Sequence, residues 1–202
     1  MSVIKPSRCC ELRWITDILN YAKLESGRIQ YEIESTPLPD AMKTVEELVA
    51  PLASASHIAL DVSGGCPDVR VCADPEKLRQ VLINLLSNAI KYTEPGGRVS
   101  VHCSVDDDHV LIDIIDTGVG IPADRLEAIF EPFVQVERAY TGQRQGTGLG
   151  LSISRDLARG MGGELTVRSE LGKGSTFTIR LRADRGQDRQ AAAATAGEAQ
   201  PR

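Results

Sequence analysis

One segment of the chain combines a face suited to burial with a face of polar groups that could bind a ligand. In residues 82–93, LINLLSNAIKYT, leucine, isoleucine and alanine recur at the three- and four-residue spacing of a buried helix face. Asn84, Asn88 and Lys91 fall at i, i+4 and i+7, so they share a second face of the same helix. Two amides and an ammonium on one face are binding candidates, although Lys91 alone also fits a solvated helix end.

Three glycine clusters follow this helix, at residues 116–122 (DTGVGIP), 146–154 (GTGLGLSIS) and 172–176 (GKGST). The second is the most informative, because glycines directly before a helix let backbone N–H groups converge on an anion such as phosphate. It is not a Walker A loop, since it lacks the Gly-Lys-Ser/Thr ending. It is not a Rossmann fingerprint either, since no ribose-binding acid follows a βαβ unit at the right distance. Both common nucleotide-binding motifs are therefore excluded.

Helices predicted from apolar periodicity and end signals must position these residues. Ser26-Gly27 stops the first helix, and Asp40 caps the second after a linker at 35–40 whose two prolines block helix formation. Asp74-Pro75 supplies a cap and a first-turn proline for the helix with the polar face. The run 154–156 fits a solvated helix face. The other predicted helices cover residues 11–28, 41–55, 122–130 and 149–162.

Alternating segments predict strands, two of them paired through the acidic turn 106–108. Residues 131–148 have no period, which is typical of a functional loop, and the chain from 183 has the composition of a disordered tail. We therefore expect a helix followed by an α+β sandwich, with one mixed sheet backed by helices. The strand segments cover residues 57–65, 69–73, 98–105, 109–116 and 164–182.

The order of the motifs resembles the ATP-binding catalytic domain of bacterial sensor histidine kinases, in the superfamily that includes gyrase, heat-shock chaperones and mismatch-repair ATPases. The matching motifs are the asparagine helix, DTGVG, FEPF, GTGLGLSIS and GKGSTF. The resemblance implies a two-layer α/β sandwich, the Bergerat ATP-binding fold, over residues 37–182. Residues 1–36 would hold part of a dimerisation and phosphoacceptor hairpin, since the helix at 11–28 is similar to the end of its second helix. Residues 183–202 would be the tail.

The resemblance gives the polar helix face its roles. Asn88 would coordinate Mg²⁺ through its amide oxygen, a hard ligand for a hard cation. Asn84 would support the metal or its waters, Lys91 would neutralise phosphate charge, and Tyr92 would lie beside the nucleotide. Related ATPases that activate water carry glutamate where this chain has Asn84, and an amide cannot take a proton from water. This difference favours phosphoryl transfer over hydrolysis.

The glycine clusters receive roles from the same resemblance. Asp116 would accept a hydrogen bond from the adenine amino group, while Gly118 and Gly120 would leave room for the base; alone, Asp116 also fits a strand-end turn. Ser175 or Thr176 would reach adenine through water. The phosphate-binding amides would come from Gly146, Thr147, Gly148, Leu149 and Gly150.

Phe130 and Phe133 resemble the hydrophobic anchor of the family's ATP lid (131–147), and they also fit a plain core. These residues complete the candidate site, whose cofactors would be ATP and Mg²⁺.

The chain departs from the family pattern because no histidine precedes His57. The phosphoacceptor would therefore lie in a hairpin supplied by another chain or by a longer protein, and no catalytic residue is identified. A receiver domain of a response regulator and a second copy, paired through residues 11–28, are the other implied partners. The alternatives are a nucleotide-binding regulatory module without phosphotransfer, a serine kinase of the anti-sigma-factor type, and an ATP-hydrolysing clamp or chaperone.

Composition limits the remaining possibilities. The net charge of −5 argues against a nucleic-acid-binding role, and no apolar run is long enough to span a bilayer. The N-terminus lacks the apolar core of a signal peptide, which favours a cytoplasmic location. Five cysteines without CxxC spacing are expected to be reduced thiols.

Overall fold

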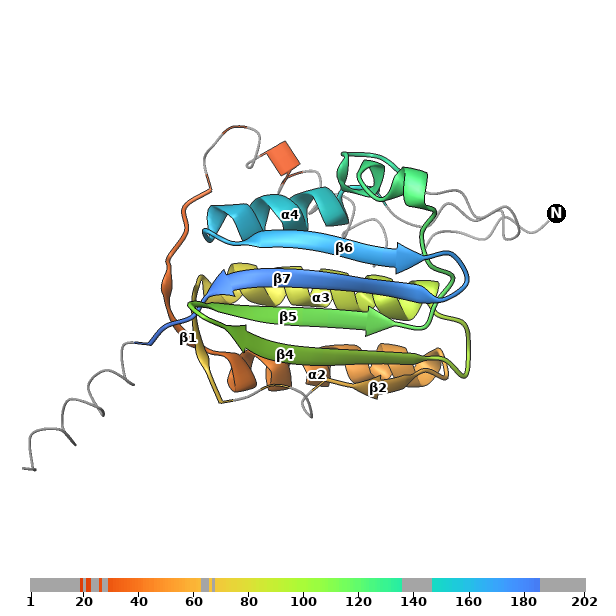
Figure 1. The fold of residues 1–202 in the computed structure, drawn as a ribbon, viewed down its shortest axis with the longest axis horizontal. Coiled ribbons are helices and arrows are strands. Elements are labelled where there is room, and N and C mark those ends of the chain that lie inside the picture. The colour runs from red at the N-terminus through yellow and green to blue at the C-terminus, as the bar shows by residue number, and fades with distance from the viewer. Residues whose placement is uncertain are drawn as a thin grey trace, which may run out of the picture.

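A five-stranded mixed sheet carries its α-helices on one face (Figure 1). The structure is a computed structural model, and it describes residues 19, 21–22, 26, 29–62, 66, 68–135 and 147–185. The helices are α2 (Leu38–Ala55), α3 (Pro75–Tyr92) and α4 (Gly150–Gly160), with 3₁₀ turns η1 (Ala123–Arg125) and η2 (Ala128–Phe130). The strands are β1 (Glu34–Pro37), β2 (Ala59–Asp61), β3 (Arg70–Ala73), β4 (Arg98–Asp106), β5 (His109–Asp116), β6 (Glu164–Glu170) and β7 (Gly174–Arg182).

The order of strands in the main sheet is β2-β4-β5-β7-β6. Strand β2 is parallel to β4, and the other neighbours are antiparallel. The two predicted hairpins, β4–β5 and β6–β7, are confirmed and pair with each other through β5 and β7. Their register places Asp116 opposite Ser175, and Ser175 opposite Ser169. These three residues therefore share one row at the edge of the sheet where β5 ends.

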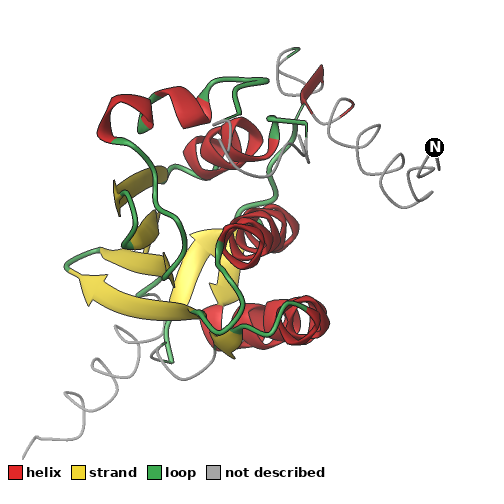
Figure 2. Ribbon diagram, turned by 90° about the vertical axis from the view of Figure 1, so that its right-hand side faces the viewer, coloured by secondary structure: helices red, strands yellow, loops and turns green. Residues whose placement is uncertain are grey.

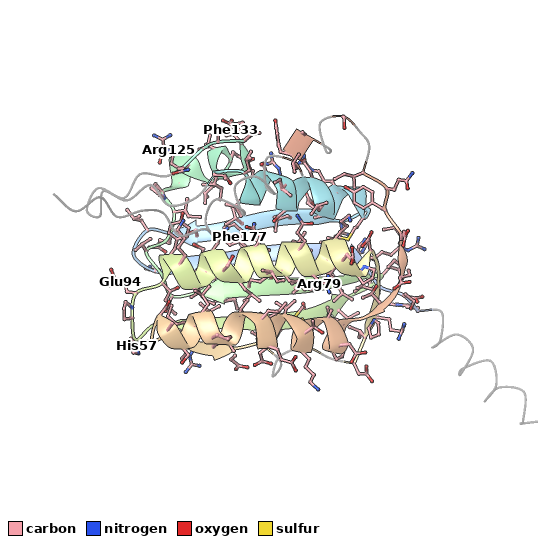
Figure 3. All side chains as sticks on the ribbon, turned by 180° about the vertical axis from the view of Figure 1, so that it is seen from behind. His57, Arg79, Glu94, Arg125, Phe133 and Phe177 are labelled. Carbon is pink, nitrogen blue, oxygen red and sulfur yellow. A yellow bond between two sulfur atoms is a disulfide. The ribbon has the colours of Figure 1, made fainter. Side chains whose placement is uncertain are left out.

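The core lies between the sheet and the helical layer (Figure 2). Every second residue of β5 is buried, among them Ile112 and Ile114. The leucines that predicted a buried face on α3 are buried, and Leu82 and Leu86 are fully inaccessible. Viewed from the helical side, α2 and α3 lie next to each other across the sheet (Figure 3). The predicted sandwich is confirmed.

The start of α3 follows the prediction in detail. The Asp74 carboxylate accepts hydrogen bonds from the backbone N–H groups of Glu76 and Lys77, at 3.0 and 3.1 Å. Its other oxygen accepts from the N–H of Glu32 at 3.1 Å. Burial raises the pKa of Asp74, but these backbone donors outweigh it and lower the pKa below its ordinary value. The Asp74 cap thus fixes the start of α3 and holds the chain segment at Glu32 against it.

The predicted linker at 35–40 is wrong. Residues Glu34–Pro37 form β1, which pairs antiparallel with β3, and α2 begins at Leu38 rather than at 41. Both prolines are tolerated, because Pro37 is the N-cap and Pro39 lies in the first turn, where a backbone N–H has no helical partner. Asp40 lies in the first turn of α2 instead of capping it.

Two other expectations change, and several predicted segments lie outside the described residues. The predicted helix at 122–130 is a pair of 3₁₀ turns, η1 and η2. Ordered structure continues past the expected boundary at 182, because Ala183 forms a β-bridge with Val71 and its N–H donates to the Asp108 carbonyl at 2.8 Å. Most of the helix expected at 11–28, residues 136–146 of the lid, and the tail from 186 lie outside the described residues.

The prediction of five reduced thiols is wrong for one pair. Cys66 and Cys103 form a disulfide, with Cα atoms 4.5 Å apart, whereas Cys72 is free. Cys66 precedes β3 and Cys103 lies within β4, so the pairing depends on the fold and has no signal in the cysteine spacing. Along the described parts of the chain, we find no helix long and apolar enough to cross a membrane.

Candidate functional site

The polar face of α3 carries the first group of candidate residues. Asn84 and Asn88 are half-buried, and Lys91 and Tyr92 are exposed at the end of the helix. The Lys91 ammonium lies 4.9 Å from the centre of the Tyr92 ring, a cation–π distance. The structure thus presents two amides and one ammonium along a single helix.

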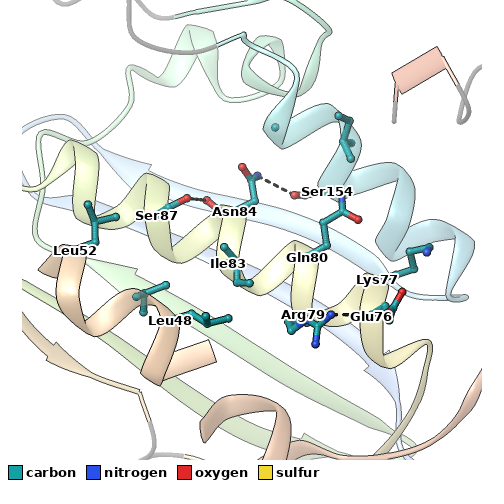
Figure 4. A pocket seen from close by; sticks show the side chains of 13 residues that line it. Leu48, Leu52, Glu76, Lys77, Arg79, Gln80, Ile83, Asn84, Ser87 and Ser154 are labelled. Carbon is teal, nitrogen blue, oxygen red and sulfur yellow. Dashed lines mark hydrogen bonds and ion pairs between the residues drawn. The ribbon is translucent and has the colours of Figure 1, made fainter. Parts of the chain in front are cut away.

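Asn84 is tied to the helix that follows the second glycine cluster. Its side-chain nitrogen donates to the Ser154 hydroxyl at 2.9 Å (Figure 4). A Cβ on Gly150 would overlap the Asn84 amide oxygen, so glycine lets α4 approach α3 closely without displacing that side chain. Ser154 is 1% exposed, and the interpretation of 154–156 as a solvated face is therefore wrong at this residue. Sequence reasoning missed Ser154 because its partner lies 70 residues away.

This contact borders a groove of 580 Å³ between α2, α3 and α4 (Figure 4). Asn84, Ser87 and Ser154 supply polar lining, and Leu48 and Leu52 of α2 supply apolar lining. Asn84 therefore belongs to a surface recess and to the contact between two helices. The amide remains on the polar face that it shares with Asn88.

Asp116 ends β5 with only 6% of its surface exposed. One carboxylate oxygen accepts from the Gly118 N–H at 2.8 Å. Burial raises the pKa of Asp116, while hydrogen bonds from the backbone of Gly118 and from the backbone and hydroxyl of Ser175 oppose the rise. A carboxylate has about four lone-pair directions, so these three donors leave acceptor capacity for a ligand amino group.

The glycines after Asp116 allow chain segments to meet. A Cβ on Gly118 would overlap the Tyr92 carbonyl oxygen at the end of α3, and a Cβ on Gly120 would overlap the Glu170 carbonyl oxygen of β6. Gly120 also has a φ of +69°, a left-handed conformation that favours glycine. In this structure backbone fills the space beside both glycines. They therefore bring α3, β5 and β6 together around Asp116, as well as being candidates to border a base.

The second glycine cluster is only partly within the described residues, and Gly146 lies outside them. The Thr147 hydroxyl accepts from the N–H of Leu149 at 3.2 Å, and Leu149 itself is fully buried. Gly148 has a φ of +72°. The Leu149 amide is thus used within the turn, and its side chain anchors the start of α4 in the core. Gly148 thus lies beside the lid base at Phe133, and Gly150 lies beside Asn84 of α3.

The two ends of the lid segment meet at a hydrogen bond. The N–H of Phe133 donates to the Gly148 carbonyl at 3.0 Å, and a Cβ on Gly148 would lie 2.8 Å from the Phe133 carbonyl carbon. Phe133 is 64% exposed, with its ring 5.9 Å from that of Tyr21. Phe130 is buried, with its ring 6.5 Å from Phe177 and 4.7 Å from the Arg155 guanidinium. Phe130 is therefore a core residue, and Phe133 is a surface residue at the lid base.

The register decides which hydroxyl of 175–176 shares a face with Asp116. Ser175 is opposite Asp116 and is buried, whereas Thr176 is opposite Ile115 and points to the other face of the sheet. Of Ser175 and Thr176, only Ser175 bonds to the Asp116 carboxylate. Ser175 is thus the hydroxyl that the fold brings to the site.

The donor set near α3 limits how a cation could bind. Among the described residues, no group of three or more histidine, cysteine, aspartate or glutamate side chains could hold a metal ion. Amide oxygens of the asparagines are hard donors, and Mg²⁺ commonly takes few protein ligands together with water and substrate phosphates. The residues present fit a magnesium ion that arrives with a nucleotide and do not fit a permanent metal centre.

Comparison with known proteins adds to this geometry. Residues 73–185 match the family of histidine kinase-, DNA gyrase B- and HSP90-like ATPases. The sensor histidine kinase RcsC of Escherichia coli K12 is 41% identical over 175 residues, which cover 84% of this chain and 18% of RcsC. LuxQ of Vibrio vulnificus YJ016, an autoinducer 2 sensor kinase/phosphatase, is 34% identical over 86% of this chain and 21% of LuxQ. The chain thus spans about a fifth of these relatives.

Solved structures of histidine kinases share the fold. Full-length ShkA in complex with AMPPNP superposes with a TM-score of 0.71 at 34% identity, over 86% of this chain and 36% of ShkA. The catalytic domain of ThkA superposes with a TM-score of 0.62 at 29% identity, over 75% of this chain and 95% of that domain. The predicted fold class is confirmed by this agreement.

Proposed function

Because the chain belongs to the family of histidine kinase-, DNA gyrase B- and HSP90-like ATPases, we propose that it binds Mg-ATP and transfers the γ-phosphoryl group to a histidine of a partner hairpin. Its relatives are sensor histidine kinases, and the chain has their ATP-binding catalytic domain. The proposal adds the metal, the acceptor and the roles of individual residues.

The observation that carries the proposal is the environment of Asp116. A buried carboxylate with spare acceptor capacity, at a turn of two glycines, is suited to the exocyclic amino group of adenine. Guanine carries a carbonyl oxygen at that position, which a carboxylate would repel. The site would therefore select ATP over GTP through Asp116, with Ser175 donating to the carboxylate and holding it in place.

The phosphates would lie along the polar face of α3 and against the start of α4. Lys91 would neutralise phosphate charge, and Asn88 would hold Mg²⁺ through its amide oxygen. When bound, Mg²⁺ supplies positive charge that stabilises the transferring phosphoryl group. The remaining task of the protein is alignment, because phosphoryl transfer depends mainly on positioning and charge stabilisation. Gly150 keeps the start of α4 close to Asn84 of α3 for that alignment.

Asn84 favours transfer of the γ-phosphoryl group over hydrolysis of ATP. Its amide has no proton-accepting group for water, and it is already bonded to Ser154. The acceptor would instead be an imidazole nitrogen, which forms a bond to γ-phosphorus as the bond to the bridging oxygen breaks and ADP leaves. A receiver domain would then accept the phosphoryl group, and a second copy of the chain would pair through residues 11–28.

Radiolabelled ATP tests the proposal directly. The full chain is incubated with [γ-³²P]ATP and Mg²⁺, with and without a separate histidine-containing hairpin from a sensor kinase. We expect label on the hairpin alone, labile in acid and stable in base, and none on a hairpin whose histidine is replaced by glutamine.

Other outcomes identify the alternatives. Acid-stable label on a protein would indicate a serine kinase. Rapid release of free phosphate without labelled protein would indicate an ATP-hydrolysing protein. Calorimetry that detects ATP binding, with no transfer to any hairpin, would indicate a regulatory module.

A further inference from the structure

Ser169 lies in the same row as Asp116 and Ser175, but on the outermost strand of the sheet. The motifs above give it no role. Its side chain faces the turn that follows Asp116, although it is separated from that turn by 48 residues in sequence. This position makes Ser169 the point where the outer hairpin meets the turn.

Three groups contact the Ser169 hydroxyl. It accepts from the N–H of Ile121 at 2.8 Å, which ties down the end of the turn. It donates to the Gly174 carbonyl at 2.8 Å, and it lies 3.0 Å from the Ser175 hydroxyl. A side chain of two heavy atoms thus bridges the turn after β5, the β6–β7 connection and the hydroxyl that bonds to Asp116.

We propose that Ser169 is a positioning residue for nucleobase recognition, which holds Ser175 and the turn 117–121 in the geometry that lets Asp116 read adenine. The inference rests on the proposed function, because it assumes that Asp116 binds the base. Ser169 would touch neither nucleotide nor metal.

The chemistry of the hydroxyls explains why the effect should reach Asp116. Ser175 has one proton, which it donates to the Asp116 carboxylate. Its oxygen is then left as an acceptor, and the single proton of Ser169 is shared between this oxygen at 3.0 Å and the Gly174 carbonyl at 2.8 Å. Without Ser169, the Ser175 hydroxyl loses a neighbour and the Ile121 N–H loses its acceptor. The carboxylate would then be held less firmly, and base discrimination would fall before folding is lost.

Ser169→Ala tests the proposal in the full chain. Affinities for Mg-ATP and Mg-GTP are measured by calorimetry. We expect ATP affinity to fall about 5- to 10-fold, the usual effect of losing one or two neutral hydrogen bonds. GTP affinity should change less than about twofold, so the preference for ATP shrinks. Ser169→Thr, which keeps the hydroxyl, should restore the preference.

Thr178→Val is the matched control. Thr178 lies on β7 and its hydroxyl donates to Asp113 at 2.6 Å, but on the opposite face of the sheet. It should leave the ATP preference unchanged. If Ser169→Ala does not fold, Ser169→Cys carries the same expectation, because a thiol is similar in size but a weak hydrogen-bonding group.

Two results would overturn the inference. The first is a Ser169→Ala or Ser169→Cys variant that folds and keeps the wild-type ATP preference. The second is an equal loss in Thr178→Val, which would mean that any weakened sheet has this effect. A wild-type chain that does not bind ATP would instead contradict the proposed function itself.

Discussion

The two ends of the candidate nucleotide site are built in different ways. At the base end, Asp116, Ser175 and Ser169 form one hydrogen-bonded row across three strands, and backbone groups fill the space around them. At the phosphate end, Asn88 and Lys91 project from α3, and the approach of α4 depends on one side-chain contact, Asn84 with Ser154. The base end is therefore enclosed by backbone and held by hydrogen-bonded hydroxyls, whereas the phosphate end depends on half-buried and exposed side chains of α3.

Asn88→Ala probes the phosphate end and should have the largest effect. Changing groups that only support a metal ligand commonly costs 10- to 100-fold, so removal of the proposed ligand itself should lower Mg-ATP affinity about 100-fold. Titration calorimetry with Mg²⁺ or with EDTA measures this. Ser87→Ala is the control, because Ser87 lies on α3 beside the site and bonds only to the Asn84 backbone carbonyl in the described structure. Equal ATP affinity in Asn88→Ala and wild type would contradict the assignment.

Asp116→Asn probes the base end. Loss of a hydrogen bond to a charged group costs about 1.5–3 kcal/mol, so ATP affinity should fall roughly 10- to 100-fold. Unlike Asn88→Ala, the loss should be independent of Mg²⁺, because Asp116 lies at the base end. Competition between ATP and GTP, with and without Mg²⁺, separates the two variants. A loss in Asp116→Asn that disappears in EDTA would remove the distinction between the two ends.

Two glycine substitutions compare the rigidity of the ends. In Gly118→Ala the new Cβ meets the Tyr92 backbone, which cannot rotate away, and overpacking of this kind costs about 1–3 kcal/mol. In Gly150→Ala it meets the Asn84 side chain, which can move. Urea unfolding should therefore show a loss for Gly118→Ala and little change for Gly150→Ala. The reverse order would show that α4, rather than the turn, is the rigid element.

The smallest expected effect is a pH dependence of stability. Burial raises the pKa of Asp116 in the folded protein, so between its ordinary value of about 4 and the raised value the folded state binds more protons than the unfolded state. Stability from this group therefore falls as pH rises through that window. The unfolding free energy of Asp116→Asn relative to wild type should move in favour of the variant from pH 3.5 to 7. A difference that is constant with pH would show that burial does not perturb Asp116.

The sequence predicted the elements whose signals are local. The polar face of α3, its Asp74 cap and the two hairpins each depend on residues close in the chain, and all are present. The resemblance to sensor histidine kinases rests on the order of such local motifs, and the comparisons confirm the family.

The sequence-based predictions that were wrong concern residues whose structure depends on contacts between distant segments. Residues 34–37, which overlap the predicted linker at 35–40, form strand β1 because they pair with β3. Cys66 and Cys103 lie close together only in the folded sheet. Ser154 looked like a solvated position because its neighbours in sequence are charged, but the packing of α4 on α3 buries it. Ser169 likewise has no local signal, since the turn that it holds lies 48 residues earlier.

The strand β3 has one further consequence, for the mechanics of the domain. Val71 pairs with Thr36 of β1 on one side and with Ala183, after β7, on the other. Strands are spaced about 5 Å apart, so the incoming and outgoing chain lie roughly 10 Å from each other. A force that pulls these two segments apart would therefore act on the pairing of β3 with β1 and with Ala183 before it acts on the main sheet.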